Sequence, residues 1–246
     1  MRLDKFLSLC GKASRSETLR SVRRGEITVN GVPARRGDCP VEPDTDTVAF
    51  RGETVVYRPY TYVMLHKPDG VVSATEDRLA GEPTVLDLLP PELTRLRPGL
   101  FPCGRLDKHT TGLMLLTNNG KLAHRLLSPA RHVDKTYAFT VKFPLSAEDV
   151  AALESGVSLR NADGGTDCVT ALCRVELTDC TGRGAAGRIT LHEGKYHQIK
   201  RMLAARGKPV VYLKRLTMGP LMLDPALERG EWRPLSAEEV AALRQA

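Results

Sequence analysis

Gly104-Arg-Leu-Asp107-Lys-His-Thr-Thr-Gly112-Leu-Met-Leu-Leu-Thr117 is the stretch that decides the fold of this 246-residue chain. Its second part, residues 113–117, is a short continuous apolar run, which predicts a strand buried inside a sheet. Its first part is polar, so we expect a loop that carries Asp107 to the edge of the core. The stretch therefore predicts a charged loop fixed to a central strand.

The segments around this strand predict more strands than helices. Alternating or continuous apolar residues predict strands near residues 62–65, 135–141, 169–177, 188–192 and 210–213. Helical spacing and capping residues predict helices at residues 147–155, at residues 196–206 and after Ser236. Because strands and helices do not alternate along the chain, we expect an α+β fold with helices and loops flanking a mixed, mostly antiparallel sheet.

The first part of the chain predicts a separate small α+β module. Ser14 and Glu17 form a capping box, so a helix begins there, with Leu19 and Val22 as its buried stripe. Asn30 and the glycine after it stand between β-type residues and mark a tight hairpin turn. The spacing of the arginines in this helix gives them one exposed face, which carries Arg20, Arg23 and Arg24.

A linker is expected near residues 51–60, and it divides the chain into domains at residues 1–58 and 59–246. No coiled coil or obvious apolar interface stripe stands out in either domain, which favours a monomer. No apolar run approaches the roughly 18 residues that a membrane span needs. The N-terminus has no signal-peptide core, so we expect a cytoplasmic protein without membrane contact.

The net charge of +7 is concentrated in two stretches. Residues 1–36 hold nine Lys or Arg against three Asp or Glu, and residues 188–215 hold eight against one. Two basic patches on a nearly neutral remainder favour a polyanionic partner, most simply nucleic acid.

No motif for a metal or a nucleotide cofactor is found. The six cysteines include no Cys-x-x-Cys pair, which favours reduced thiols over a disulfide framework or a zinc site. Residues 182–187 read Gly-x-Gly-x-x-Gly, but a strand pattern follows where a dinucleotide site needs a helix. We expect a flexible hairpin loop there, and no cofactor.

Asp107 is the strongest candidate for chemistry. A carboxylate beside an apolar strand is partly desolvated and needs a cation to stay ionised. Arg105 is close in sequence, and Lys200 or Arg201 could reach it from the second basic patch. An ionised carboxylate of low mobility can act as a nucleophile or base. A structural Asp–Arg pair that pins the loop explains the same residues, and both interpretations stay open at this point.

The N-terminal motifs resemble the S4 RNA-binding domain. They are Arg2-Leu-Asp4-Lys-Phe6-Leu, Ser14-Arg-Ser16-Glu17 and Arg24-Gly-Glu-Ile-Thr-Val-Asn30-Gly31. The resemblance covers the whole first module. It implies that the arginine-rich helix and the hairpin bind structured RNA.

Three segments of the larger domain resemble, in this order, the RsuA-type pseudouridine synthases, which also carry an N-terminal S4 domain. They are residues 104–117, Lys135-Thr-Tyr137 and Glu193-Gly-Lys-Tyr-His-Gln-Ile-Lys-Arg-Met202. The resemblance implies that Asp107 is the indispensable catalytic residue. It also implies that Tyr137 stacks on the target base and helps to remove its C5 proton, and that Lys200 pairs with the catalytic carboxylate. RNA contacts are expected from Arg105, Lys195, His197 and Arg201.

The resemblance implies isomerisation of uridine to pseudouridine in ribosomal RNA. The base must leave the stack, the N1–C1′ bond breaks, and C5 joins C1′. These steps need no redox cofactor and no metal, which agrees with the missing motifs. Whether Asp107 attacks C1′ or C6, or whether a glycal route begins with deprotonation, stays open.

The target is expected to be one uridine of 16S rRNA, of the uridine-516 type, in free rRNA or in a small-subunit assembly particle. Residues 196–202 and Ser128-Pro-Ala-Arg-His132 resemble the small-subunit branch of the family. One alternative is a 23S rRNA enzyme of the same family. The other is a non-catalytic RNA-binding factor of ribosome assembly, which the S4-like module would serve equally well.

Overall fold

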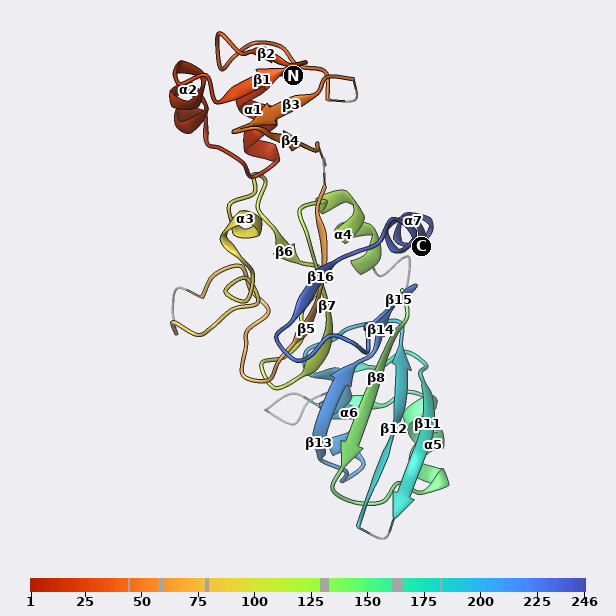
Figure 1. Ribbon diagram of the computed structural model, residues 1–246. Helices are drawn as coiled ribbons and strands as arrows, with labels where there is room; N and C mark the ends of the chain where they lie inside the picture. Colours follow the sequence, from red (N-terminus) through yellow and green to blue (C-terminus); the bar gives the residue numbers. More distant parts are fainter. Residues whose placement is uncertain (44, 58–59, 78–79, 129–132, 161–165, 182) are drawn as a thin grey trace. The chain divides into compact units, whose positions relative to one another are not determined.

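The computed structural model describes the chain except residues 44, 58–59, 78–79, 129–132, 161–165 and 182 (Figure 1). The chain divides into two compact units. The first comprises Met1–Thr61, Leu86–Phe101 and Thr117–Asn119, and the second comprises Tyr62–Val85, Pro102–Leu116 and Gly120–Ala246. The predicted domain boundary falls on residues 58–59, outside the described residues, and stays a prediction. No helix in the described part of the chain is long and apolar enough to cross a membrane.

The first unit has an α+β arrangement at its N-terminal end, as predicted. Its elements are α1 (Leu3–Leu9), α2 (Arg15–Arg23), β1 (Ile27–Val29), β2 (Val32–Pro33), β3 (Val48–Phe50), β4 (Glu53–Val55) and the short α3 (Pro91–Thr94). The strands form an antiparallel sheet in the order β2-β1-β3-β4. Strand β4 lies within the segment that we expected to be a linker, because it extends the hairpin from β3.

The start of α2 forms as its sequence predicts. The Ser14 side chain accepts a hydrogen bond from the Glu17 backbone, and the Glu17 carboxylate accepts one from the Ser14 backbone. Val22 is buried in the core of this unit, but Leu19 is 48% exposed, so the prediction of a buried stripe was wrong for Leu19. The three arginines of the predicted exposed face, Arg20, Arg23 and Arg24, are all exposed.

The second unit is built on one large mixed sheet, as predicted. Its strands are β5 (Tyr62–Lys67), β7 (Thr111–Thr117), β8 (Lys135–Val141), β9 (Ser158–Arg160), β10 (Thr166–Val169), β11 (Arg174–Thr181), β12 (Gly184–Leu191), β13 (Val210–Arg215), β14 (Thr217–Met218), β15 (Leu221–Met222) and β16 (Trp232–Pro234), together with the two-residue strand β6 (Phe101–Pro102). Its helices are α4 (Gly120–Leu127), α5 (Ala147–Glu154), α6 (Gln198–Ala205) and α7 (Ala237–Gln245).

The strand order of the large sheet is β11-β12-β8-β13-β7-β5-β16, and β6 pairs with β7. Strands β13 and β7 are parallel, whereas β8 runs antiparallel to both β12 and β13. Every residue of β7 is buried, which confirms the prediction of a central strand. At Gly112 a β-carbon would lie 2.2 Å from the Arg215 carbonyl oxygen, and its φ is +106°. Only glycine permits this close approach of β7 and β13.

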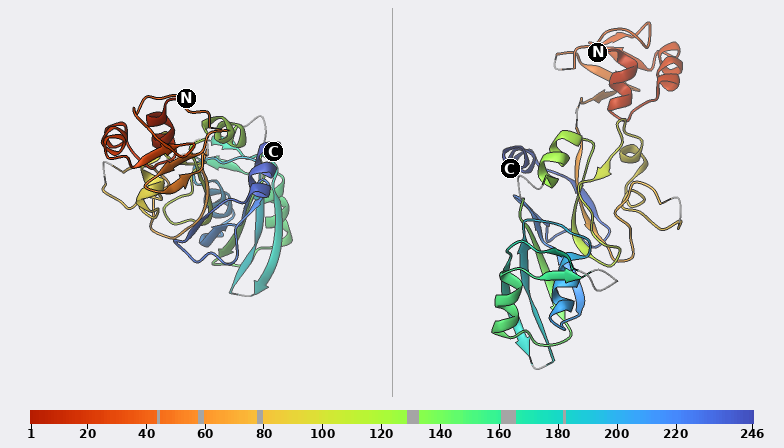
Figure 2. Two further views of the ribbon diagram at one scale, coloured as in Figure 1. Left: turned by 45° about the horizontal axis from the view of Figure 1, so that its top comes forward. Right: turned by 180° about the vertical axis from the view of Figure 1, so that it is seen from behind.

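Two helices, α5 and α6, cover one face of the sheet formed by β11, β12, β8 and β13 (Figures 1 and 2). The residues of α6 that we expected to face inward, Ile199, Met202 and Leu203, are buried there. Gly184 and Gly187 lie in β12, so the flexible loop predicted for residues 182–187 was wrong for these two. A β-carbon at Gly187 would lie 2.5 Å from the Glu176 carbonyl oxygen, so the glycine serves close strand packing.

The N-terminus of α5 is tied to the end of α6 through Asp149. Arg206 Nε lies 3.0 Å and Lys208 Nζ lies 3.3 Å from the carboxylate, whose side chain is 8% exposed. Burial alone raises the pKa of Asp149, but hydrogen bonds from Ser146, Arg206 and Lys208 outweigh it and lower the pKa to about 2. The carboxylate therefore stays ionised and stabilises the helical layer behind the sheet.

Candidate active site

The loop that carries Asp107 connects β6 to β7, and its backbone is fixed by two buried side chains. Ser73 Oγ donates to the Leu106 carbonyl at 2.7 Å and accepts from the Leu106 backbone N–H at 3.0 Å. Lys67 Nζ donates to the carbonyls of Lys108 at 3.0 Å and Thr110 at 2.9 Å. Both residues are buried, and burial lowers the pKa of Lys67 to about 8. The loop is thus held on both sides of Asp107.

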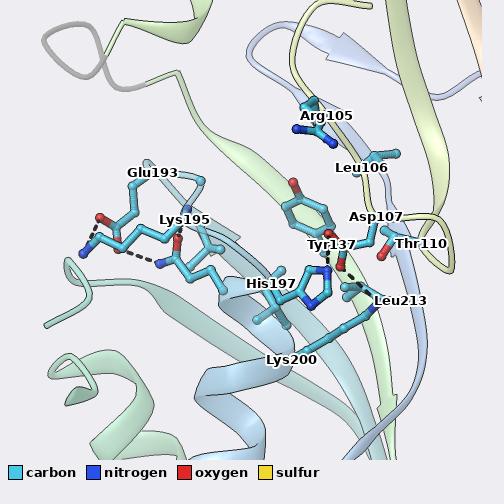
Figure 3. Close-up of a pocket in the computed structure, with 14 residues that line it drawn as sticks. Arg105, Leu106, Asp107, Thr110, Tyr137, Glu193, Lys195, His197, Lys200 and Leu213 are labelled. Carbon is cyan, nitrogen blue, oxygen red and sulfur yellow. Dashed lines mark hydrogen bonds and ion pairs between the residues drawn. The ribbon is translucent and has the colours of Figure 1, made fainter. Parts of the chain in front are cut away.

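The Asp107 carboxylate is held by two groups from the α6 region. Lys200 Nζ lies 3.0 Å from Oδ2, and His197 Nε2 lies 3.4 Å from Oδ1. Figure 3 shows the carboxylate between these groups and the Tyr137 ring. We expected a cation beside Asp107, and the contact with Lys200 confirms that expectation. A carboxylate that is 25% exposed and contacted on both oxygens has little freedom to rotate.

Tyr137 and Arg105 line the same pocket as Asp107, as expected (Figure 3). Tyr137 lies on β8, two positions before the buried Phe139, so strand alternation turns both rings to the helix-covered face. Arg105 precedes Asp107 by two residues and is exposed. The pocket therefore combines an aromatic ring, a fixed carboxylate and cationic side chains.

His197 reaches Asp107 through an uncommon backbone conformation. It is the N-cap of α6 with φ +47° and ψ 34°, in the left-handed region. Its ring stacks on Tyr196, with the ring centres 4.0 Å apart. Gln198, which is buried, donates to Glu193 and accepts from the Lys195 backbone N–H. These contacts fix the turn between β12 and α6, and the turn presents His197 to the carboxylate.

The other residues predicted to contact RNA lie in three different places, and not all of them line the Asp107 pocket. Lys195 lines the pocket, but its ammonium lies 3.2 Å from Glu193 and donates to the Val169 carbonyl. Arg201 does not line this pocket: it pairs with Asp167 at 2.9 Å on another side of α6. Of the two residues considered as the cation beside Asp107, Lys200 is therefore the one that contacts it. Arg20, Arg23 and Arg24 belong to the first unit. Residues 129–132, part of the predicted small-subunit signature, lie outside the described residues.

A second cavity, of about 510 Å³, shares Arg105 and Tyr137 with the Asp107 pocket. Its wall also includes Lys135 and Arg215, which are 9% and 1% exposed. Burial, and then the charge of Arg215, lowers the pKa of Lys135. Tyr137 therefore lines both the Asp107 pocket and a cavity whose described lining residues do not include Asp107.

Sequence reasoning missed the supports of the site. Lys67 is the last residue of a fully buried strand. Because a lysine is buried only where its ammonium has partners, this position in the sequence could have indicated that Lys67 supports the neighbouring loop. The direct contact of His197 with Asp107 depends on the left-handed turn before α6, which no residue pattern in the segment announces. A paired carboxylate facing an aromatic ring can attack or deprotonate a planar substrate that enters the pocket.

Comparisons with known proteins agree with this geometry. The family model described as RNA pseudouridylate synthase matches residues 61–205, and the S4 domain model matches residues 1–46. The chain is 47% identical over 245 residues to the uncharacterized RNA pseudouridine synthase YtzG of Bacillus subtilis (strain 168), covering 100% of this chain and 99% of that protein. It is 39% identical to the ribosomal small subunit pseudouridine synthase A of Pseudomonas aeruginosa, with 99% of this chain and 100% of that protein covered.

The fold agrees as well. A solved structure described as a pseudouridylate synthase superposes with a TM-score of 0.65 at 34% identity, and the match covers 99% of each chain. The interpretation as an RNA-binding factor without catalytic activity is therefore set aside. With a matching catalytic domain, a matching S4 domain and relatives of similar length, the chain belongs to the RNA pseudouridylate synthase family and is an RNA pseudouridine synthase.

Proposed function

We propose that this enzyme converts one uridine of small-subunit ribosomal RNA to pseudouridine, at the uridine-516-type site expected from the sequence. The proposal is supported by relatives named ribosomal small subunit pseudouridine synthase A. These include the protein of Escherichia coli (strain K12), which is 37% identical over 244 residues, with 99% of this chain and 100% of that protein covered. The observation that carries the chemistry is the Asp107 carboxylate, paired by Lys200 and His197 in the pocket that Tyr137 lines.

In the proposed reaction the target uridine leaves the RNA stack and enters the Asp107 pocket. Unstacking costs a few kcal/mol, and stacking of the base on Tyr137 recovers about 1–3 kcal/mol. The N1–C1′ bond breaks, the base turns, and C5 bonds to C1′. The C5 proton leaves to solvent while N1 takes up a proton, so atoms and electrons balance without a co-reactant.

Each residue of the site has a proposed part in these steps. Asp107 acts on C1′ or C6, or removes a proton in a glycal route. Lys200 and His197 hold its carboxylate in one orientation. Arg105 contacts the RNA beside the extruded nucleotide and helps to hold it outside the stack. Tyr137 stacks on the base and assists removal of the C5 proton.

The test is tritium release from 16S and 23S transcripts labelled with 5-³H-uridine, both as naked RNA and in assembly particles. Wild type is compared with Asp107→Ala and with Asp69→Ala, a control at an exposed carboxylate of a neighbouring loop. We expect release from 16S substrates that Asp107→Ala abolishes and Asp69→Ala retains. Release from 23S RNA alone would contradict the small-subunit target, and equal release by wild type and Asp107→Ala would contradict the proposed role of Asp107.

A further inference from the structure

The backbone of Thr110 is fixed within the wall of the Asp107 pocket. Its N–H donates to the Asp107 carbonyl at 3.0 Å, and its carbonyl accepts from Lys67 Nζ at 2.9 Å. The residue is 2% exposed and lines the pocket together with Asp107 and Tyr137 (Figure 3). The position of its side chain is therefore set by the same contacts that position the carboxylate.

The Thr110 hydroxyl is buried, and within the described part of the chain it has no hydrogen-bond partner. Two other buried hydroxyls, those of Ser73 and Thr117, do have hydrogen-bond partners. Ser73 both donates to and accepts from Leu106, and Thr117 Oγ1 donates to the Thr61 carbonyl at 2.8 Å. Burying a hydroxyl without a partner costs free energy, and a methyl group of the same size would avoid that cost.

The location of the hydroxyl indicates what its partner is. Both backbone groups of Thr110 are already paired, and the residue lines the pocket that holds the reacting carboxylate. A group that enters this pocket can supply the missing hydrogen bond. A hydroxyl can both donate and accept, so it suits a ribose hydroxyl or the polar edge of a uracil ring.

We propose that the Thr110 hydroxyl hydrogen-bonds the extruded nucleoside and helps to orient it against Asp107. The inference rests on the proposed function, because the nucleoside must enter this pocket. It makes Thr110 a substrate-contacting residue whose hydroxyl is unpaired in the free enzyme and paired in the complex.

The test replaces the hydroxyl by a methyl group of equal size in Thr110→Val. Single-turnover tritium release at saturating enzyme should fall about tenfold, the effect of one neutral hydrogen bond. The Tm of the free protein should stay unchanged or rise, by up to about 2–4 °C at this chain length, because an unpaired buried hydroxyl is removed. Thr110→Ser keeps the hydroxyl and should keep most of the rate.

The matched control is Thr117→Val, at the far end of β7, the strand that begins directly after Thr110. Its hydroxyl donates to the Thr61 carbonyl and accepts from the Asn119 backbone N–H, so this variant should have a lower Tm. Its rate, measured well below that Tm, should stay near the wild-type value. A Thr110→Val protein that is slower and also less stable by a similar amount would indicate a structural hydroxyl and overturn the inference. A wild-type rate in Thr110→Val would overturn it too.

Substrate analogues identify the partner atom and serve as a second test. Wild type and Thr110→Val, or Thr110→Ala if the valine variant fails to fold, are compared on RNAs carrying a single 2′-deoxyuridine or 4-thiouridine at the target. If the hydroxyl contacts the altered atom, the two losses are not additive. Additive losses with both analogues overturn the proposed contact at these atoms. Failure of wild type to release tritium from any uridine substrate would instead contradict the proposed function itself.

Discussion

Replacing the buried Lys67 by methionine should loosen the loop that carries Asp107. The ammonium donates three hydrogen bonds, to the carbonyls of Pro68, Lys108 and Thr110. Hydrogen bonds from a charged donor contribute about 1.5–3 kcal/mol each. Burying the charge opposes this stabilisation and costs about 3 kcal/mol, because the pKa is lowered from 10.5 to about 8. We expect a net loss of about 3 kcal/mol in unfolding free energy, which lowers Tm by about 6–12 °C.

The same substitution should reduce catalysis, because two of the three carbonyls flank Asp107. Displacement of a reacting group by about 1 Å can cost about a hundredfold in rate. The assay is single-turnover tritium release well below the Tm of the variant, together with thermal unfolding. The control is Lys12→Met, at an exposed lysine 3.6 Å from Glu53, which should change neither quantity appreciably. Wild-type Tm and rate in Lys67→Met would refute this reasoning.

The Lys67 ammonium also gives this prediction a pH dependence. Because its pKa is lower in the folded protein, the cost of the buried charge is fully present below pH 8 and is relieved as the pH rises towards 10.5. The difference in unfolding free energy between wild type and Lys67→Met should therefore grow, by up to about 3 kcal/mol, between pH 8 and pH 10.5. Urea unfolding at several pH values measures it, and a difference that shrinks with pH would contradict the assigned burial cost.

Three further predictions follow from other contacts. Asp149→Asn should cost about 2 kcal/mol of unfolding free energy at pH 7, because the pKa of the carboxyl is lowered to about 2. Urea unfolding should show this difference from wild type vanishing as the pH falls from about 4 through 2. Gly112→Ala should prevent folding or cost more than about 3 kcal/mol, since its β-carbon would lie 2.2 Å from the Arg215 carbonyl oxygen; soluble protein with wild-type Tm would contradict this. Tyr196 is 76% exposed and stacks on His197, so Tyr196→Ala should weaken RNA binding by about fivefold or more and Tyr196→Phe should not, as measured by filter binding.

The parts of this fold that could be predicted from sequence are those governed by local patterns. The capping box at Ser14 and the apolar run of β7 each depend on a few neighbouring residues, and both formed as expected. Tyr137 and Lys200 were assigned to the site by resemblance, and the structure brings both to the pocket of Asp107. Their proposed roles in the reaction stay predictions.

The parts that could not be predicted depend on contacts between distant segments. Helical spacing predicts which residues share one face of a helix, but not how much of that face other elements cover. Leu19 lies on a part of α2 that stays exposed. Gly187 suggested a loop, but in the sheet it allows β12 and β11 to approach closely. The unpaired hydroxyl of Thr110 is invisible in sequence, since its neighbours must be known before a missing partner can be noticed.

The parallel pairing of β7 with β13 also constrains when the enzyme becomes active during its own synthesis. Thr111 in β7 and its contact Leu213 in β13 are 102 residues apart in sequence. Lys200, the partner of Asp107, lies on the helix just before β13. The pocket therefore cannot be completed until the chain as far as β13 has left the ribosome that makes it. Such distant pairings form slowly, so a nascent or truncated chain carries its arginine-rich helix well before it has a working active site.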